Sequence, residues 1–225
     1  MKLRYYGLIT LIVVTITIGL GLYYKSSYRD YNQMETPLNE FAIALLGDDL
    51  FEPQLECMKN YLDDSNIIIA ARCEEKFQFR YSCTTQEVSI VKVFRGEGMK
   101  AGDVLDIVRD SSFISSDDRT RINGKLQINL GFVNEMIPGK TYLLFIEGIV
   151  PNYTSETIYS LSERFIIAPI FCYEDIKNIP NPIVDDNFRF TDYDNVKNNE
   201  YFITSEEADK KIREFKKEVL SKYPC

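Results

Sequence analysis

The sequence predicts a mainly β fold with flanking helices, built around an antiparallel barrel. Three observations support this class. The spacing of apolar residues changes from about 3.6 to about 2 after residue 64. Short strand candidates then follow one another without a long helix between them, and helical spacing returns only near the C-terminus. This order is typical of antiparallel barrels and sandwiches rather than of βαβ units.

The strand candidates are separated by turn signals. In the clearest of them, residues 126–132, Leu126, Ile128 and Leu130 alternate with polar residues or glycine. Residues 111–125 are mostly polar, so we expect a long surface loop there between two strands. The other strand candidates are 67–71, 77–81, 87–94, 104–108, 141–146 and 158–167.

The first residues predict a membrane anchor. Residues 5–24 carry no charge and are rich in Ile, Leu and Val, and a helix of that length spans a bilayer core of about 30 Å. A cleaved signal peptide is the alternative, but its apolar region is usually about 7–15 residues long and ends in a small-residue site. We therefore expect a cytoplasmic tip over 1–4, a single span over 5–24, and a C-terminal domain outside the cell membrane.

The remainder is expected to divide into three parts. Residues 25–50 form a stalk whose apolar end has helical spacing, and residues 51–173 form the barrel domain with a lead-in helix opened by Pro53. Residues 174–225 form an irregular segment and a C-terminal amphipathic helix that begins at Thr204 with Glu207 in a capping box. The apolar positions of the two helices are Phe51, Leu55, Met58, Leu62, Ala208, Ile212, Phe215 and Val219.

Four segments together resemble a known family. They are Ser-Asn-Ile-Ile-Ile-Ala at 65–70, a strand ending in Arg95-Gly96, the Gly102-Asp103 start of the next strand, and Pro-Gly-Lys-Thr-Tyr-Leu at 138–143. This succession resembles the netrin/TIMP-like OB-fold domains of bacterial surface proteins over residues 65–150. The resemblance implies an OB-like barrel. It does not extend to metalloprotease inhibition, because that activity relies on a free N-terminal Cys and this chain begins with an apolar span.

The composition excludes several activities. The chain has no His and a net charge of −8. Without His there is no Ser-His-Asp triad, no Cys-His pair and no His-ligated zinc. The negative charge argues against nucleic acid as a partner. We predict no catalytic, cofactor-binding or metal-binding residues and no cofactor.

Three short motifs have simpler explanations than function. The glycine spacing of 96–101 fits a dinucleotide loop, but a strand follows at once, which favours a hairpin. Ser89 and Lys92 fit a penicillin-binding motif, yet on a strand they point to opposite faces. Asp192, Asp194 and Glu200 suggest a calcium loop, but the required glycine is missing.

The five cysteines leave the redox state open. Cys73 and Cys83 flank a short excursion and form a candidate disulfide across neighbouring strands. A bridge between Cys57 and Cys172, or five reduced thiols, are the alternatives, and Cys225 is expected to be unpaired.

These observations predict a membrane-anchored, extracytoplasmic binding protein that is not an enzyme. Its partners would be the membrane, through the N-terminal helix, and a protein contacted by the loop 111–125. One alternative is an extracellular hydrolase that uses carboxylates, which would require two acids in one pocket with at least one raised pKa. The other alternative is a structural role in envelope assembly, which would require a large exposed apolar patch.

Overall fold

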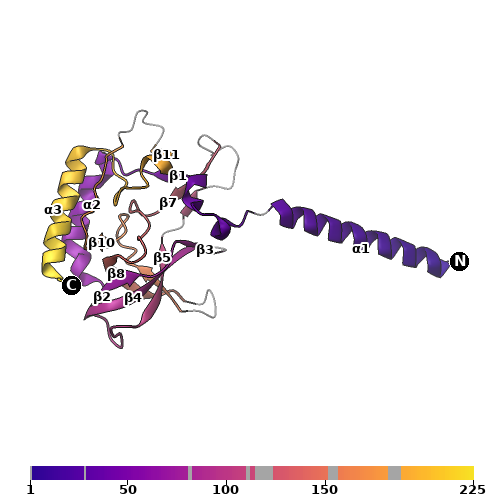
Figure 1. Cartoon of the computed structure of the whole chain (residues 1–225), viewed down its shortest axis with the longest axis horizontal. Coiled ribbons are helices and arrows are strands. Elements are labelled where there is room, and N and C mark those ends of the chain that lie inside the picture. The colour runs from indigo at the N-terminus through magenta and orange to yellow at the C-terminus, as the bar shows by residue number, and fades with distance from the viewer. Residues whose placement is uncertain are drawn as a thin grey trace. The chain divides into compact units, whose positions relative to one another are not determined.

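The computed structural model describes residues 2–27, 29–80, 83–109, 112–114, 124–151, 157–181 and 189–225. The chain divides into two units, Met1–Pro37 and Leu38–Cys225. The larger unit contains all the described strands and two of the three described α-helices (Figure 1).

The first unit consists of α1 (Lys2–Ser27) and a single 3₁₀ turn, η1 (Tyr31–Gln33). Asp30 caps η1, because its carboxylate accepts a hydrogen bond from the backbone N–H of Asn32 at 3.1 Å. Over the residues that the structure describes, no helix has both the length and the apolar character needed to cross a membrane. The anchor expected over 5–24 stays a prediction.

Five strands close into a barrel. They are β2 (Ile67–Cys73), β4 (Thr84–Arg95), β5 (Val104–Arg109), β8 (Thr141–Ile149) and β9 (Ile158–Leu161). Hydrogen bonding runs β2–β4–β5–β9–β8 and returns from β8 to β2. This confirms a mainly β fold with a closed five-stranded barrel, which is compatible with the expected OB-like barrel.

One pair of strands corrects the expectation of a wholly antiparallel barrel. β5 and β9 run parallel, with Asp106 opposite Ile158 and Val108 opposite Ser160. The reason is geometric. Strand directions cannot alternate all the way round a closed ring with an odd number of strands, so one neighbouring pair must be parallel.

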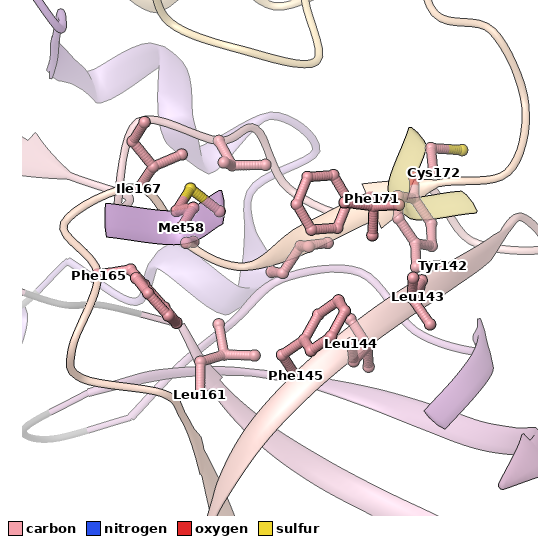
Figure 2. Packing of buried hydrophobic residues seen from close by; sticks show 14 of the residues in the cluster. Met58, Tyr142, Leu143, Leu144, Phe145, Leu161, Phe165, Ile167, Phe171 and Cys172 are labelled. Carbon is pink, nitrogen blue, oxygen red and sulfur yellow. The ribbon is translucent and has the colours of Figure 1, made fainter. Parts of the chain in front are cut away.

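The buried interior of this unit extends from the barrel to two helices. β2 and β8 are apolar on both faces, since one face lines the barrel and the other is covered. Around Phe145 and Phe171, side chains from β8, the segment after β9 and α2 pack together (Figure 2). The ring of Phe171 also lies 5.9 Å from that of Phe215, which connects the barrel to the C-terminal helix.

The two helices are α2 (Asp48–Tyr61) and α3 (Glu206–Lys222), and they lie side by side (Figure 1). The predicted apolar stripe of α3 is confirmed, and so is the buried face of α2 with Leu62 in the following 3₁₀ turn η3 (Leu62–Asp64). The expected start at Thr204 is one residue early, because Ser205 caps α3 by accepting from the N–H of Ala208 at 3.1 Å. Pro53 lies inside α2 rather than opening it, and Lys216 of α3 is buried.

A second, smaller sheet corrects two further expectations. The stretch expected to be helical before Gly47 forms the 3₁₀ turn η2 (Pro37–Glu40) and then β1 (Phe41–Ala44), whose four residues are all buried. β1 pairs in parallel with β7 (Leu126–Asn129) and antiparallel with β11 (Phe190–Asp192). The expected irregular segment 174–204 therefore contains a strand, followed by the 3₁₀ turn η5 (Tyr193–Asn195).

The remaining strands are short. β3 (Gln78–Phe79) pairs with β4, β6 (Ser112–Ile114) with β7, and β10 (Ile170–Cys172) with β8. The loop expected over 111–125 thus contains a strand at 112–114, and 115–123 lie outside the described residues. The strand candidates 126–132 and 158–167 end early, at Asn129 and Leu161, where each chain segment turns away to form the wall of a cavity.

Candidate functional site

A cavity of about 320 Å³ lies at the parallel seam between β5 and β9. Its walls come from β5, β9, the end of β7 and the segment that follows β9. This volume is at the small end of the range for ligand cavities, about 300–1,000 Å³. The lining residues are Val108, Asn129, Gly131, Ser160, Leu161, Ser162, Glu163, Phe165, Ile166, Ala168 and Pro169.

A tight turn at Gly131 forms one wall of this cavity. Gly131 has a φ of +65°, and its N–H donates to the side-chain oxygen of Asn129 at 2.9 Å. Its carbonyl accepts from the N–H of Ala168 at 2.8 Å, which ties the turn to the opposite wall. A Cβ at position 131 would lie 2.9 Å from the Cβ of Ala168. Glycine therefore allows the two walls to approach this closely.

Phe132 continues the turn in a strained conformation. Its φ is +56°, a left-handed value that costs a non-glycine residue about 1–2 kcal/mol. The surrounding structure holds it there, since its side chain is buried and its carbonyl accepts from the N–H of Phe202 at 2.9 Å. Strain of this kind is concentrated at ligand-binding and active sites. Its position beside the cavity favours a functional role for this site.

The cavity combines an apolar wall with a few polar groups. Leu161 and Phe165, which lie together in Figure 2, contribute buried apolar surface. The polar groups are the hydroxyls of Ser160 and Ser162, the side chain of Asn129 and the exposed carboxylate of Glu163. This combination suits recognition of a compact ligand that is largely apolar and carries one or two polar groups.

A second cavity, of about 120 Å³, is lined by two glutamates. Glu135 and Glu200 approach it from the segment after β7 and from the segment before α3. The other lining residues are Val133, Asn134, Ile137, Tyr142, Ile170, Ile176, Lys197, Asn198 and Asn199. The cavity has room for several water molecules.

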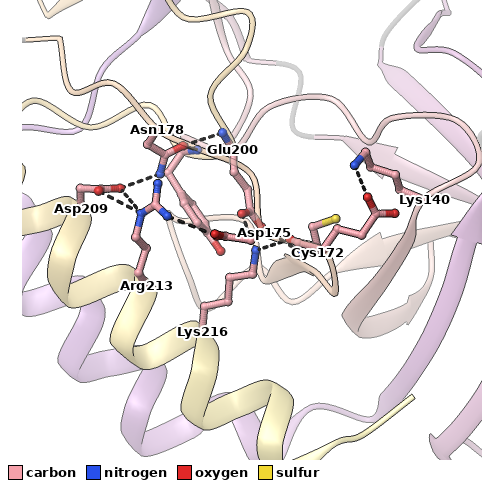
Figure 3. Close-up of polar contacts among 10 residues, drawn as sticks. Lys140, Cys172, Asp175, Asn178, Glu200, Asp209, Arg213 and Lys216 are labelled. Atoms are coloured by element: carbon pink, nitrogen blue, oxygen red, sulfur yellow. Dashed lines mark hydrogen bonds and ion pairs between the residues drawn. The ribbon is translucent and has the colours of Figure 1, made fainter.

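Glu200 belongs to a buried ion pair. Its carboxylate lies 2.5 Å from the ammonium of Lys216, which reaches it from α3, and both side chains are less than one-tenth exposed (Figure 3). The same carboxylate accepts from the N–H of Cys172 at 3.0 Å, and Lys216 also donates to the carbonyl of Glu174. Burial raises the pKa of Glu200, and Lys216 opposes this shift. The pair connects α3 to the barrel wall.

Glu135 has weaker partners. The hydroxyl of Tyr193 lies 3.2 Å from its carboxylate and 3.0 Å from the side-chain oxygen of Asn134. Burial raises the pKa of Glu135, while Tyr193 and the charge of Arg109 lower it by smaller amounts. Glu135 therefore favours its protonated form more than an exposed glutamate does.

The two cysteines of the candidate disulfide are free thiols in the structure. Cys73 is buried, its thiol donates to the carbonyl of Glu75 at 3.2 Å, and burial raises its pKa to about 12. Cys83 is half-buried, and burial raises its pKa as well. Such thiols ionise poorly and react slowly. A bridge between them stays a prediction.

The other sequence motifs are placed as follows. Residues 96–101 connect β4 to the antiparallel β5, which confirms the hairpin. Ser89 and Lys92 both lie on β4, and the Ser89 hydroxyl donates to Glu74. The acids of the segment 192–200 are separately ion-paired. Asp192 pairs with Lys125 at 3.2 Å and Asp194 with Lys197 at 3.0 Å.

Sequence reasoning missed both cavities. Their lining residues are spread over segments as far apart as Val108 and Pro169, or Val133 and Glu200. One signal was available for the first cavity. Gly131 stands inside the predicted strand 126–132, and a glycine inside a strand often marks a close approach of two backbones.

No protein-family model and no curated protein matches this chain. Function is therefore inferred from the geometry of the cavities.

Proposed function

We propose that the chain is a membrane-anchored, extracytoplasmic binding protein whose barrel domain holds a compact ligand at the β5–β9 seam. The observation that carries the proposal is the cavity of about 320 Å³ with its mixed lining and its strained neighbour Phe132. The netrin/TIMP-like resemblance is part of the proposal. OB-type barrels are widely used for binding, although a fold alone does not determine function.

Binding is favoured over catalysis by the groups present. The described lining of this cavity offers two serine hydroxyls and one carboxylate, and the chain has no His to activate a serine. Ser162 donates only a long hydrogen bond, 3.4 Å, to the carboxylate of Glu147. These groups can orient a ligand through hydrogen bonds.

The binding proposal is tested with the full chain in detergent micelles. Fragments of mixed polarity are screened by ligand-observed NMR, and hits are titrated while the unfolding temperature is recorded. A ligand present at a hundred times its Kd stabilises the folded state by about 2.7 kcal/mol, which gives a clear shift. A screen in which no fragment binds or raises the unfolding temperature contradicts the proposal.

The membrane part of the proposal rests on α1. Apolar side chains at the consecutive positions Leu11–Val14 are about half exposed or more, and consecutive positions of a helix point in different directions. Exposed apolar surface of this extent on a helix is stabilised by a cover such as lipid. The full chain should resist carbonate extraction from membranes, and a chain lacking residues 2–27 should not. Equal extraction of both contradicts membrane insertion.

Orientation is tested at the exposed Cys225. A membrane-impermeant maleimide should label it in intact cells, and Cys225→Ser should remove that label. Labelling that requires lysis places the domain inside the cell instead.

A second candidate function is favoured by one observation. Glu135 and Glu200 line the same cavity, and burial raises the pKa of both, as a carboxylate-dependent hydrolase requires. Against it stand the small volume, about 120 Å³, and the Lys216 partner that already holds Glu200. Hydrolysis of small chromogenic esters or glycosides that is lost in Glu135→Gln would establish this function. If the wild-type protein hydrolyses none of these substrates, binding remains the proposed function.

A further inference from the structure

We propose that the ligand of the β5–β9 cavity carries a cationic amine on an apolar body. This inference rests on the proposed binding function and names the chemical class that the cavity selects. Four features carry it: the charge of the lining, the acid that Ser162 contacts, the orientation of the neighbouring arginine, and the apolar part of the lining.

The lining is negatively charged over the residues that the structure describes. Among the described lining residues, Glu163 carries a charge, and the other side chains are apolar or end in a hydroxyl or an amide. Burying a charged group of a ligand is costly unless an opposite charge or hydrogen bonds compensate it. An anionic ligand would meet a carboxylate at this site, whereas an amine would meet a partner.

A second carboxylate, that of Glu147, is hydrogen-bonded to the lining. The hydroxyl of Ser162 is 3.4 Å from one oxygen of Glu147, and the side chain of Asn66 donates to the other oxygen at 3.1 Å. Ser162 is buried, so it transmits the polarity of Glu147 to the cavity wall through its hydroxyl. The acidic character therefore extends from the rim towards the wall.

The neighbouring cation is directed elsewhere. Arg164 follows Glu163 in the chain, but its guanidinium lies 3.2 Å from the carboxylate of Asp64 and 5.1 Å from the ring centre of Tyr61. It is absent from the cavity lining. Glu163 thus faces a ligand without neutralisation by the adjacent arginine.

The apolar body is required by the apolar part of the lining. Leu161, Phe165, Ala168 and Pro169 are buried residues that present hydrocarbon to the cavity. Filling this space removes apolar surface of the ligand from water, at about 25 cal/mol per Å². A fully polar cation would lose this contribution, so an amine attached to an aromatic or branched aliphatic group fits best.

The test compares series of compounds that share one apolar body and end in an amine, an alcohol or a carboxylate. One series is 2-phenylethylamine, 2-phenylethanol and phenylacetate, and others carry cyclohexyl and branched aliphatic bodies. Dissociation constants are measured by ligand-observed NMR on the full chain. We expect the amine to bind most tightly in each series and the carboxylate least.

The role of Glu163 is tested with a matched pair of variants. Glu163→Gln should reduce the preference for amine over alcohol by up to about fivefold, the upper end of the range for an exposed ion pair. Glu97→Gln makes the same charge change in the exposed hairpin at the other end of β5 and should leave the preference unchanged. Added salt should weaken the preference in the wild type, because the interaction is partly exposed.

The outcomes separate the two proposals. Alcohols that bind as tightly as amines overturn the cationic ligand while the binding site stands. A preference for amines that Glu163→Gln leaves intact overturns the assignment of Glu163 as the partner of the amine. If no compound of any series binds, the proposed function itself fails.

Discussion

Gly131 is the residue on which the shape of the larger cavity depends most. Its left-handed φ and its close approach to Ala168 act together, so Gly131→Ala introduces both backbone strain and a steric clash. We expect a loss of more than about 1–2 kcal/mol in the free energy of unfolding, measured by chemical denaturation, together with weaker ligand binding.

Gly98 provides the control for this substitution. It has a φ of +78° in the exposed β4–β5 hairpin, and a Cβ there meets nothing within 4 Å. Gly98→Ala therefore measures the backbone strain alone, about 1 kcal/mol. Equal losses for the two variants would show that contact between the two walls contributes nothing.

Glu135 should give the protein a pH dependence of stability. Its pKa in the folded state is raised above the reference value of 4.5, chiefly by burial. Glu135 is protonated in both the folded and the unfolded state below pH 4.5, and there the folded state has its full stability. The folded state loses stability as the pH rises through the raised folded-state pKa, because the buried carboxyl group must then ionise. Glu135→Gln stays neutral throughout, so the variant should become more stable relative to the wild type as the pH rises. Parallel pH curves of unfolding free energy would contradict this account.

At the scale of single residues, the sequence could not predict the acids that matter. Glu135 and Glu200 look like any other glutamates in the chain, and their properties come from burial by segments far away in sequence. Lys216 lies outside the predicted apolar stripe of α3, yet it is buried and pairs with Glu200. Polar contacts of this kind are specified by tertiary structure.

Among the elements, α3 makes the clearest prediction. Phe215 is buried and its ring lies 5.9 Å from that of Phe171, so Phe215→Ala should cost about 3–5 kcal/mol of unfolding free energy. Lys210→Ala, on the exposed side of the same helix, should change it by no more than about 0.5 kcal/mol. Thermal or chemical unfolding monitored by circular dichroism measures both. Similar small losses would mean that α3 is not packed on the barrel.

The elements themselves were predictable where periodicity was sustained. The apolar stripe of α3 and the pairing of β4 with β5 follow from local spacing and turn residues. β1 was misassigned because all four residues of its short apolar run are buried, and such a run has no diagnostic period. Short buried strands and helices cannot be distinguished by pattern alone.

For the whole molecule, the barrel class was predictable but its closure was not. A succession of short strand candidates indicates a barrel, and only the pairings show that β5 and β9 meet in parallel. The cavity arises at that seam, from segments up to about sixty residues apart, so no local pattern joins its residues. The loop expected to form the contact surface, 111–125, lies largely outside the described residues.

The binding of a compact ligand at the seam is the central claim, and a pair of variants on one strand tests it directly. Val108 lines the cavity, and Val104 lies on the same outer face of β5 but outside it. Val108→Phe should fill part of the space and weaken the binding of any ligand found by at least about tenfold, whereas Val104→Phe should leave the Kd unchanged. Unchanged affinity in Val108→Phe, in a protein that remains folded, would show that the ligand binds elsewhere.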